Sequence, residues 1–229
     1  MSSETKNNNG NNQNHAYRKP EFYNIWRLIF LYLVTHVFYM IRFKFVYRLE
    51  VHGKENIPND SNFIIAANHL STLDPPLVCA IMNRGVAYMA KKELFENPFM
   101  RWWLNWLGAF AVDREKLGVS TIKTVMSLKK TNWVLGIFPQ GTRQLDGQIK
   151  HVTKGFATLA KSTKCDILPI GIIGTQEVKR IPFTGKIIVN IGKPIPYNEN
   201  VEEMVDAWGN SIEKLTGYKY ISEYSKEVS

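Results

Sequence analysis

Residues 63–76 read FIIAANHLSTLDPP, the stretch that says most about the fold of this chain. The opening FIIAA is a short apolar run, which predicts a strand buried on both faces of a sheet. The polar residues that follow place His69 and Asp74 five positions apart. Pro75 disfavours helical backbone in the residue before it, so we expect Asp74 at the end of a tight loop rather than inside a helix. Such a loop can fold the Asp74 carboxylate back onto the His69 ring.

Two interpretations of this loop are open. In the first, His69 takes up a proton near neutral pH, and Asp74 fixes its tautomer and stabilises the imidazolium. In the second, the segment is an ordinary helix start with Asp74 as the N-cap and Pro75 in the first turn, and His69 is a surface loop residue. The loop alone does not decide between them.

A second motif, FPQGTR at residues 138–143, follows the apolar run WVLGI at residues 133–137. Gly141 permits close approach of the backbone to a ligand. Thr142 supplies a hydroxyl, and the planar fork of Arg143 suits a phosphate. The alternative is a strand end that turns through Pro and Gly, with Arg143 solvated.

Together the two motifs resemble those of the PlsC-type glycerolipid acyltransferases, the 1-acylglycerol-3-phosphate acyltransferase family. The family's first block, NHxxxxD, is complete from Asn68 to Asp74. Its third block, FPEGTR, matches residues 138–143 except that Gln140 takes the place of the acid. Weaker matches are residues 90–95 with Lys91, residues 108–114 with Arg114 at the basic position, and the Leu-Pro-Ile-Gly run at residues 168–171.

The resemblance implies transfer of a fatty acyl group from an acyl carrier protein or coenzyme A thioester to the free hydroxyl of lysophosphatidic acid. The product is phosphatidic acid, a precursor in phospholipid biosynthesis. It implies catalytic roles for His69 as general base and for Asp74 as its orienting partner. The attacking oxygen belongs to the substrate, so we expect no covalent intermediate. The implied substrate-binding residues are Lys91, Arg114, Gln140, Gly141, Thr142 and Arg143.

Because Gln140 replaces the acid of the motif, alternative functions remain open. Gln keeps the size and an acceptor of Glu, but it loses the charge and gains two donors. We expect activity to survive this change. The alternatives are an acyltransferase for another lysophospholipid or for glycerol-3-phosphate, and a lipid-binding protein whose catalysis is impaired through Gln140.

The charge of the chain narrows the classes of partner. With 29 Lys and Arg against 20 Asp and Glu, the net charge is +9, which attracts nucleic acid, anionic lipid or phosphorylated substrates. The basic residues are scattered and form no recognisable reading element, so we expect no nucleic-acid binding. The two cysteines lack CxxC spacing, and no His cluster has ligand spacing, so we expect no metal site and no bound cofactor.

The N-terminal region divides into a polar, disordered tail at residues 1–20 and a membrane-associating helical segment at residues 21–46. The run from Ile25 to Ile41 is apolar apart from Arg27 and His36, and cations flank it. This pattern predicts a helix, or a helical pair, lying in or dipping into one leaflet of a membrane with anionic lipids, at the cytoplasmic face. A single span is the second interpretation, because the run is short for one. An internal core helix is the third.

Residues 47–229 form the expected acyltransferase domain. Strands are predicted around residues 49–51 and at 63–67, 86–90, 110–112, 133–138, 167–173 and 186–191. Helices are predicted at residues 75–83, 97–108, 118–131, 153–162 and 201–215. This alternation indicates an α/β fold with a largely parallel central sheet flanked by helices. Because both motifs follow strands, one cleft at the carboxyl ends of the strands can hold both.

Overall fold

The computed structural model describes residues 15–112, 118–178 and 185–223. Its centre is a seven-stranded sheet in the order β1-β8-β7-β2-β5-β3-β4. The strands are β1 (Glu50–His52), β2 (Phe63–Ala67), β3 (Gly85–Lys91), β4 (Phe110–Val112), β5 (Trp133–Ile137), β7 (Asp166–Ile173) and β8 (Ile188–Ile191). The strands from β7 to β4 are mutually parallel, and β8 runs antiparallel to β7. The predicted largely parallel sheet is confirmed.

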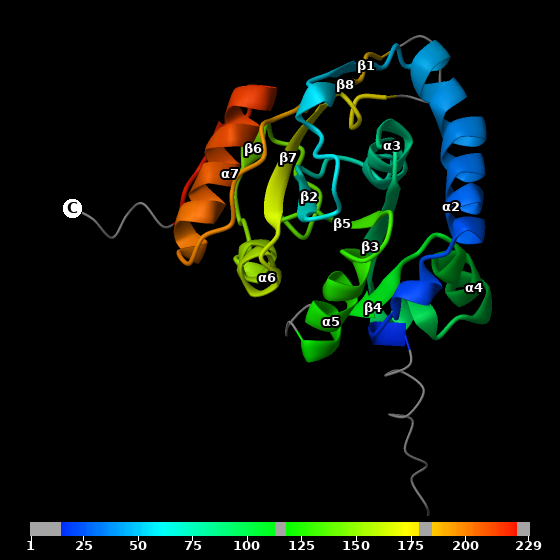
Figure 1. Cartoon of the computed structure of the whole chain (residues 1–229). Coiled ribbons are helices and arrows are strands. Elements are labelled where there is room, and N and C mark those ends of the chain that lie inside the picture. The colour runs from blue at the N-terminus through cyan, green and yellow to red at the C-terminus, as the bar shows by residue number, and fades with distance from the viewer. Residues whose placement is uncertain (1–14, 113–117, 179–184, 224–229) are drawn as a thin grey trace, which may run out of the picture.

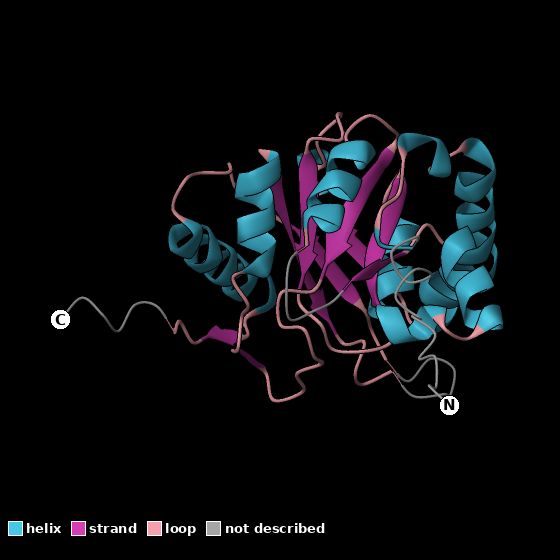
Figure 2. Cartoon of the chain, turned by 90° about the horizontal axis from the view of Figure 1, so that it is seen from below, coloured by secondary structure: helices cyan, strands magenta, loops and turns pink. Residues whose placement is uncertain are grey.

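Helices cover both faces of this sheet (Figure 1, Figure 2). The helices are α2 (Ile25–Tyr32), α3 (Asp74–Ile81), α4 (Pro98–Trp106), α5 (Val119–Leu128), α6 (Gly155–Thr163) and α7 (Val201–Thr216). On one side α5 packs on β5, α6 on β2 and β7, and α7 on β7. On the other side α3 packs on β3, and the N-terminal helix, which runs from Ile25 to Val46 and begins with α2, lies over α3. A two-stranded sheet of β6 (Gln148–Ile149) and β9 (Lys219–Tyr220) lies apart from the main one.

Strand β2 occupies the middle of the sheet because every one of its side chains is apolar and buried. It pairs in parallel with β5 on one side, with Ile64 opposite Leu135, and with β7 on the other, with Ala66 opposite Pro169. The carboxyl ends of these three strands therefore meet at one edge of the sheet. The loops that leave β2, β5 and β7 begin side by side there.

The start of α3 corrects one expectation. Asp74 was expected outside any helix, but it is the first residue of α3, directly after Leu73, and both prolines lie in the first turn. The prolines suit this place because the first helical N–H groups need no intrahelical partner. Asp74 still turns back toward the preceding loop, so the loop and the helix start are one structure.

The N-terminal region also differs from the expected boundaries. Arg18, assigned to the tail, is buried, and its N–H donates to Thr124 Oγ1 at 3.0 Å. The apolar helix runs from Ile25 to Val46, and only 17% of its most apolar window is buried. Beyond α2 it continues in π-helical turns, Leu33–Met40 and Arg42–Val46. A core helix would be mostly buried, so the low burial argues against that interpretation. The helix has 22 residues, which is long enough to span a membrane.

Candidate active site

The His69–Asp74 pair is formed. His69 Nδ1 lies 2.8 Å from Asp74 Oδ2. Because an ionised carboxylate only accepts hydrogen bonds, Nδ1 carries the proton, and the lone pair of the neutral ring is on Nε2. The His69 side chain is 18% exposed and Asp74 is fully buried. The pair has the geometry of a general base with its orienting carboxylate.

Three further donors hold the buried Asp74 carboxylate. The main-chain N–H groups of Leu70 and Ser71 donate to Oδ2 at 2.6 and 2.7 Å. The hydroxyl of Thr175 donates to Oδ1 at 2.6 Å. Each bond replaces a hydrogen bond to water that burial removes, which offsets the cost of burying the carboxylate. The charge that steadies His69 is therefore fixed in place by the loop around it.

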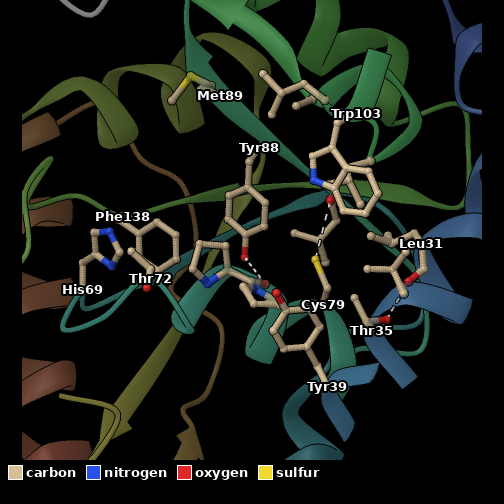
Figure 3. Close-up of a pocket in the computed structure, with 17 residues that line it drawn as sticks. Leu31, Thr35, Tyr39, His69, Thr72, Cys79, Tyr88, Met89, Trp103 and Phe138 are labelled. Carbon is tan, nitrogen blue, oxygen red and sulfur yellow. Dashed lines mark hydrogen bonds between the residues drawn. The ribbon is translucent and has the colours of Figure 1, made fainter. Parts of the chain in front are cut away.

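Aromatic rings fix the plane of the imidazole. The ring of Phe138 stacks on His69 with centroids 4.2 Å apart, and Tyr88 stacks on the Phe138 ring at 5.6 Å. Figure 3 shows the three rings side by side, with His69 at one end. Phe138 is the first residue of the second motif, so that motif positions the base directly.

An apolar cavity of about 380 Å³ begins at His69 (Figure 3). Its wall combines the loop after β2, the first turns of α3, strand β3, helix α4 and the N-terminal helix. The lining residues are Leu31, Val34, Thr35, Tyr39, His69, Thr72, Pro75, Pro76, Cys79, Val86, Tyr88, Met89, Trp103, Leu104, Leu107, Ala109 and Phe138. This composition suits a hydrocarbon chain whose reactive end lies beside the imidazole.

Cys79 lines this cavity but is not equipped as a nucleophile. Burial raises the pKa of its thiol to about 12. The thiolate is the nucleophilic form, so the thiol stays unreactive near neutral pH. Among the described residues, no group of three His, Cys, Asp or Glu side chains could hold a metal ion.

The structure joins the two predicted motifs. The main-chain N–H of Gln144, one residue beyond the second motif, donates to the carbonyl of His69 at 3.0 Å. The side-chain Oε1 of Gln140 accepts from the His69 N–H at 2.8 Å. Thr142 and Arg143 are exposed on the loop between these two contacts.

Two predicted site residues have surroundings that the sequence did not indicate. Gln140 is buried, with its side-chain amide bonded to protein groups, instead of facing substrate. A Cβ at Gly141 would meet no protein atom within 4 Å, and its φ of +67° lies in the left-handed region that favours glycine. Lys91 is exposed at the end of β3, on the same sheet edge as the loops after β2 and β5. Arg114 lies outside the described residues.

Sequence reasoning missed Thr175 and Gln144. Thr175 is 101 positions from Asp74, just beyond the end of β7, and the two meet only because β7 and β2 are neighbours. The available signal was the position of a polar residue immediately after a predicted strand. Gln144 gave no signal of its own, because the motif ends at Arg143.

A model of the family described as Acyltransferase matches residues 48–173. The chain belongs to this family. It is 35% identical over 176 residues to the 1-acyl-sn-glycerol-3-phosphate acyltransferase of Bacillus subtilis, covering 73% of this chain and 87% of the relative. It is 32% identical over 182 residues to the enzyme of the same name from Streptococcus pneumoniae, covering 77% and 67%.

The fold of this acyltransferase is also that of a solved relative. The crystal structure of the 1-acyl-sn-glycerophosphate (LPA) acyltransferase PlsC from Thermotoga maritima superposes with a TM-score of 0.61. The match covers 85% of this chain and 92% of the neighbour at 23% identity. At that identity the likeness concerns the fold.

Thr175→Val tests the support of the Asp74 carboxylate. Valine keeps the shape but removes the O–H donor, and a lost bond to a buried carboxylate lowers the free energy of unfolding by about 1–3 kcal/mol. Thr158→Val is the matched control, since this threonine is exposed and its hydroxyl donates to the carbonyl of Lys154, the residue just before α6. We expect the control to change stability by less than about 0.5 kcal/mol. Equal denaturation midpoints for both variants would show that Asp74 does not need the hydroxyl.

Proposed function

We propose that this acyltransferase transfers a fatty acyl group from an acyl thioester to the free hydroxyl of lysophosphatidic acid, forming phosphatidic acid. The observation that carries the proposal is the apolar cavity that ends at the His69–Asp74 pair. The family membership and the names of the relatives from B. subtilis and S. pneumoniae support it.

In the proposed reaction His69 Nε2 accepts the proton of the acceptor hydroxyl as its oxygen attacks the thioester carbonyl carbon. Asp74 stabilises the imidazolium that forms. The tetrahedral intermediate then collapses: the C–S bond breaks, and the thiolate leaves with the proton that His69 returns. The substrate supplies the nucleophile, which agrees with the raised pKa of the buried Cys79 thiol.

The substrates divide between two regions of the site. The cavity between α3, β3 and the N-terminal helix is suited to an acyl chain. The exposed loop with Gly141, Thr142 and Arg143 is suited to the acceptor phosphate, and we propose that Lys91 and Arg114 add positive field. The acyl donor is a thioester of acyl carrier protein or of coenzyme A, acting as co-substrate.

The N-terminal helix would hold the enzyme on a membrane with anionic lipids, at the cytoplasmic face. Most of its exposed side chains are large and apolar, among them Trp26, Phe38 and Phe45, and the basic side chains of Arg42 and Lys44 are exposed beside them. Phe99 and Trp102 of α4 are also exposed, and Trp102 contacts Phe30 of the same N-terminal helix. The two helices together offer a surface rich in aromatic groups, which favour the boundary between lipid and water.

His69→Ala tests the general base. Removing the proton acceptor should lower turnover by about 10²–10⁴-fold, measured with lysophosphatidic acid and both thioester donors. His52→Ala is the control, because His52 is an exposed histidine on β1. Near wild-type turnover in His69→Ala, or thioester consumption only with glycerol-3-phosphate or another lysophospholipid, would refute the proposal in this form.

Arg143→Ala tests the phosphate loop. Loss of the guanidinium should raise the KM for lysophosphatidic acid by about tenfold or more, because a charge-assisted bond to the phosphate is lost. Arg143→Lys keeps the charge without the fork, so its KM should lie between the two. An unchanged KM in Arg143→Ala would remove this residue from phosphate binding.

Membrane attachment is tested by co-flotation with vesicles that contain anionic lipid. The double variant Trp26→Ser and Phe38→Ser should reduce the bound fraction, because each apolar side chain contributes about 1.5–3 kcal/mol when buried. Val119→Ser removes a similarly exposed apolar side chain from α5 and should leave flotation unchanged. Equal binding of all three proteins would show that the helix is not the attachment surface.

A further inference from the structure

Two buried glutamines connect the main chain of His69 to the segment after the second motif. Gln140 is 3% exposed and Gln144 is 8% exposed. Gln140 Oε1 accepts from the His69 N–H at 2.8 Å, and its Nε2 donates to Gln144 Oε1 at 2.6 Å. Gln144 Nε2 donates to the Lys150 carbonyl at 2.6 Å, and the Lys150 N–H donates to Gln144 Oε1 at 3.1 Å.

Main-chain groups set the direction of every hydrogen bond in this series, which runs from His69 through the two glutamines to Lys150. A peptide N–H only donates and a peptide carbonyl only accepts. The His69 N–H therefore requires an acceptor at the near end of Gln140. The N–H and carbonyl of Lys150 together require that Gln144 turn its oxygen toward Gln140. Position 140 must accept at one end and donate at the other, and a side-chain amide does both.

We propose that Gln140 and Gln144 are a matched pair of positioning residues, which fix His69 and the loop bearing Thr142 and Arg143 relative to each other for acyl transfer. The pair holds both peptide groups of His69, because the Gln144 N–H also donates to the His69 carbonyl. The proposal rests on the proposed function for the reaction it serves. The hydrogen-bond chain itself is independent of the substrate.

A carboxylate at position 140 breaks the chain. Its second oxygen would face Gln144 Oε1 where an N–H now donates at 2.6 Å, so two acceptors would be in contact. Rotating the Gln144 amide does not help. Its NH₂ would then face the Lys150 N–H, and its oxygen would face the Lys150 carbonyl. The glutamine is therefore the functional residue in this chain, and restoring the acid that the FPEGTR motif carries should harm it.

A double-mutant cycle tests the pairing with Q140E, Q144A and the combined variant. In the wild-type background Q140E should lower kcat by about tenfold or more, because a buried charged group loses a partner. In the Q144A background the opposing oxygen is gone and water can donate in its place, so Q140E should change kcat by less than about twofold. Q148E introduces the same charge on β6 and should lower kcat by less than about twofold.

The pH dependence separates the hydrogen-bond chain from a charge effect. A protonated carboxyl at position 140 can donate to Gln144 Oε1, so this site raises the pKa of the introduced acid. The chain is then intact below that pKa and is lost as the pH rises through it. The ratio of Q140E to wild-type kcat should fall with rising pH. A negative charge that acted only by favouring protonated His69 would make this ratio rise with pH, and that result would overturn the proposal.

Thermal unfolding of the same variants, without substrate, provides the readout that does not depend on activity. Q140E should lower the midpoint in the wild-type background and have little effect in the Q144A background. If Q140E does not fold, the combined variant must fold, because its destabilising contact is absent. Equal losses in both backgrounds, or failure of both to fold, would refute the pairing. A cycle that holds in unfolding while no variant, wild type included, transfers acyl groups would refute only the proposed function.

Discussion

The buried carboxylate of Asp74 is the constraint on which the site depends. A charge removed from water must be surrounded by donors. The donors come from the His69 ring, from the N–H groups of Leu70 and Ser71, and from the hydroxyl of Thr175. They can converge only if the loop after β2 curls tightly, if α3 begins at Asp74, and if β7 lies beside β2. One carboxylate thus ties the loop conformation, the helix start and the strand order to the tautomer of His69.

A second, uncharged set of contacts holds the main chain and the ring plane of His69. The amides of Gln140 and Gln144 bind its peptide groups, while Phe138 stacks on its ring. An amide pair has a fixed direction without net charge, so it can hold the base close to an anionic substrate without adding repulsion. The charge that stabilises the imidazolium is then supplied by Asp74.

Much of the fold was predictable because each strand and helix carries its own local pattern. The FIIAA run predicted a central strand, and the alternation of elements predicted a parallel sheet, which the structure confirms. The pairing of His69 with Asp74 was predictable from spacing, whereas Pro75 led us to place Asp74 outside a helix, and it is the first residue of α3. The burial of Arg18 was not predictable, because the polar composition of residues 1–20 predicted a tail, while the Arg18 N–H donates to Thr124 on α5, 106 positions away in the sequence.

Contacts that depend on the order of the strands could not be predicted from local sequence patterns. Nothing near Asp74 in the sequence indicates Thr175, and the neighbourhood of β2 and β7 becomes visible only in the assembled sheet. Gln140 is a related case. A motif comparison identifies it as a substituted acid and suggests contact with substrate, whereas its role depends on Gln144 and on the Lys150 main chain, which no motif contains. Residue type and spacing located the site, but hydrogen-bond direction assigns the task of each residue within it.

The N-terminal helix connects the α/β domain to its lipid substrates. Its inner side contributes Leu31, Thr35 and Tyr39 to the wall of the cavity, and its outer side exposes Trp26 and Phe38. The same helix therefore separates the cavity from its surroundings and presents an apolar face to them. A hydrocarbon chain that enters the cavity past this helix would pass from one apolar environment to another, so little of it needs to cross water before its reactive end reaches His69. In the proposed function the helix would then belong to the substrate path as well as to the surface that binds the membrane.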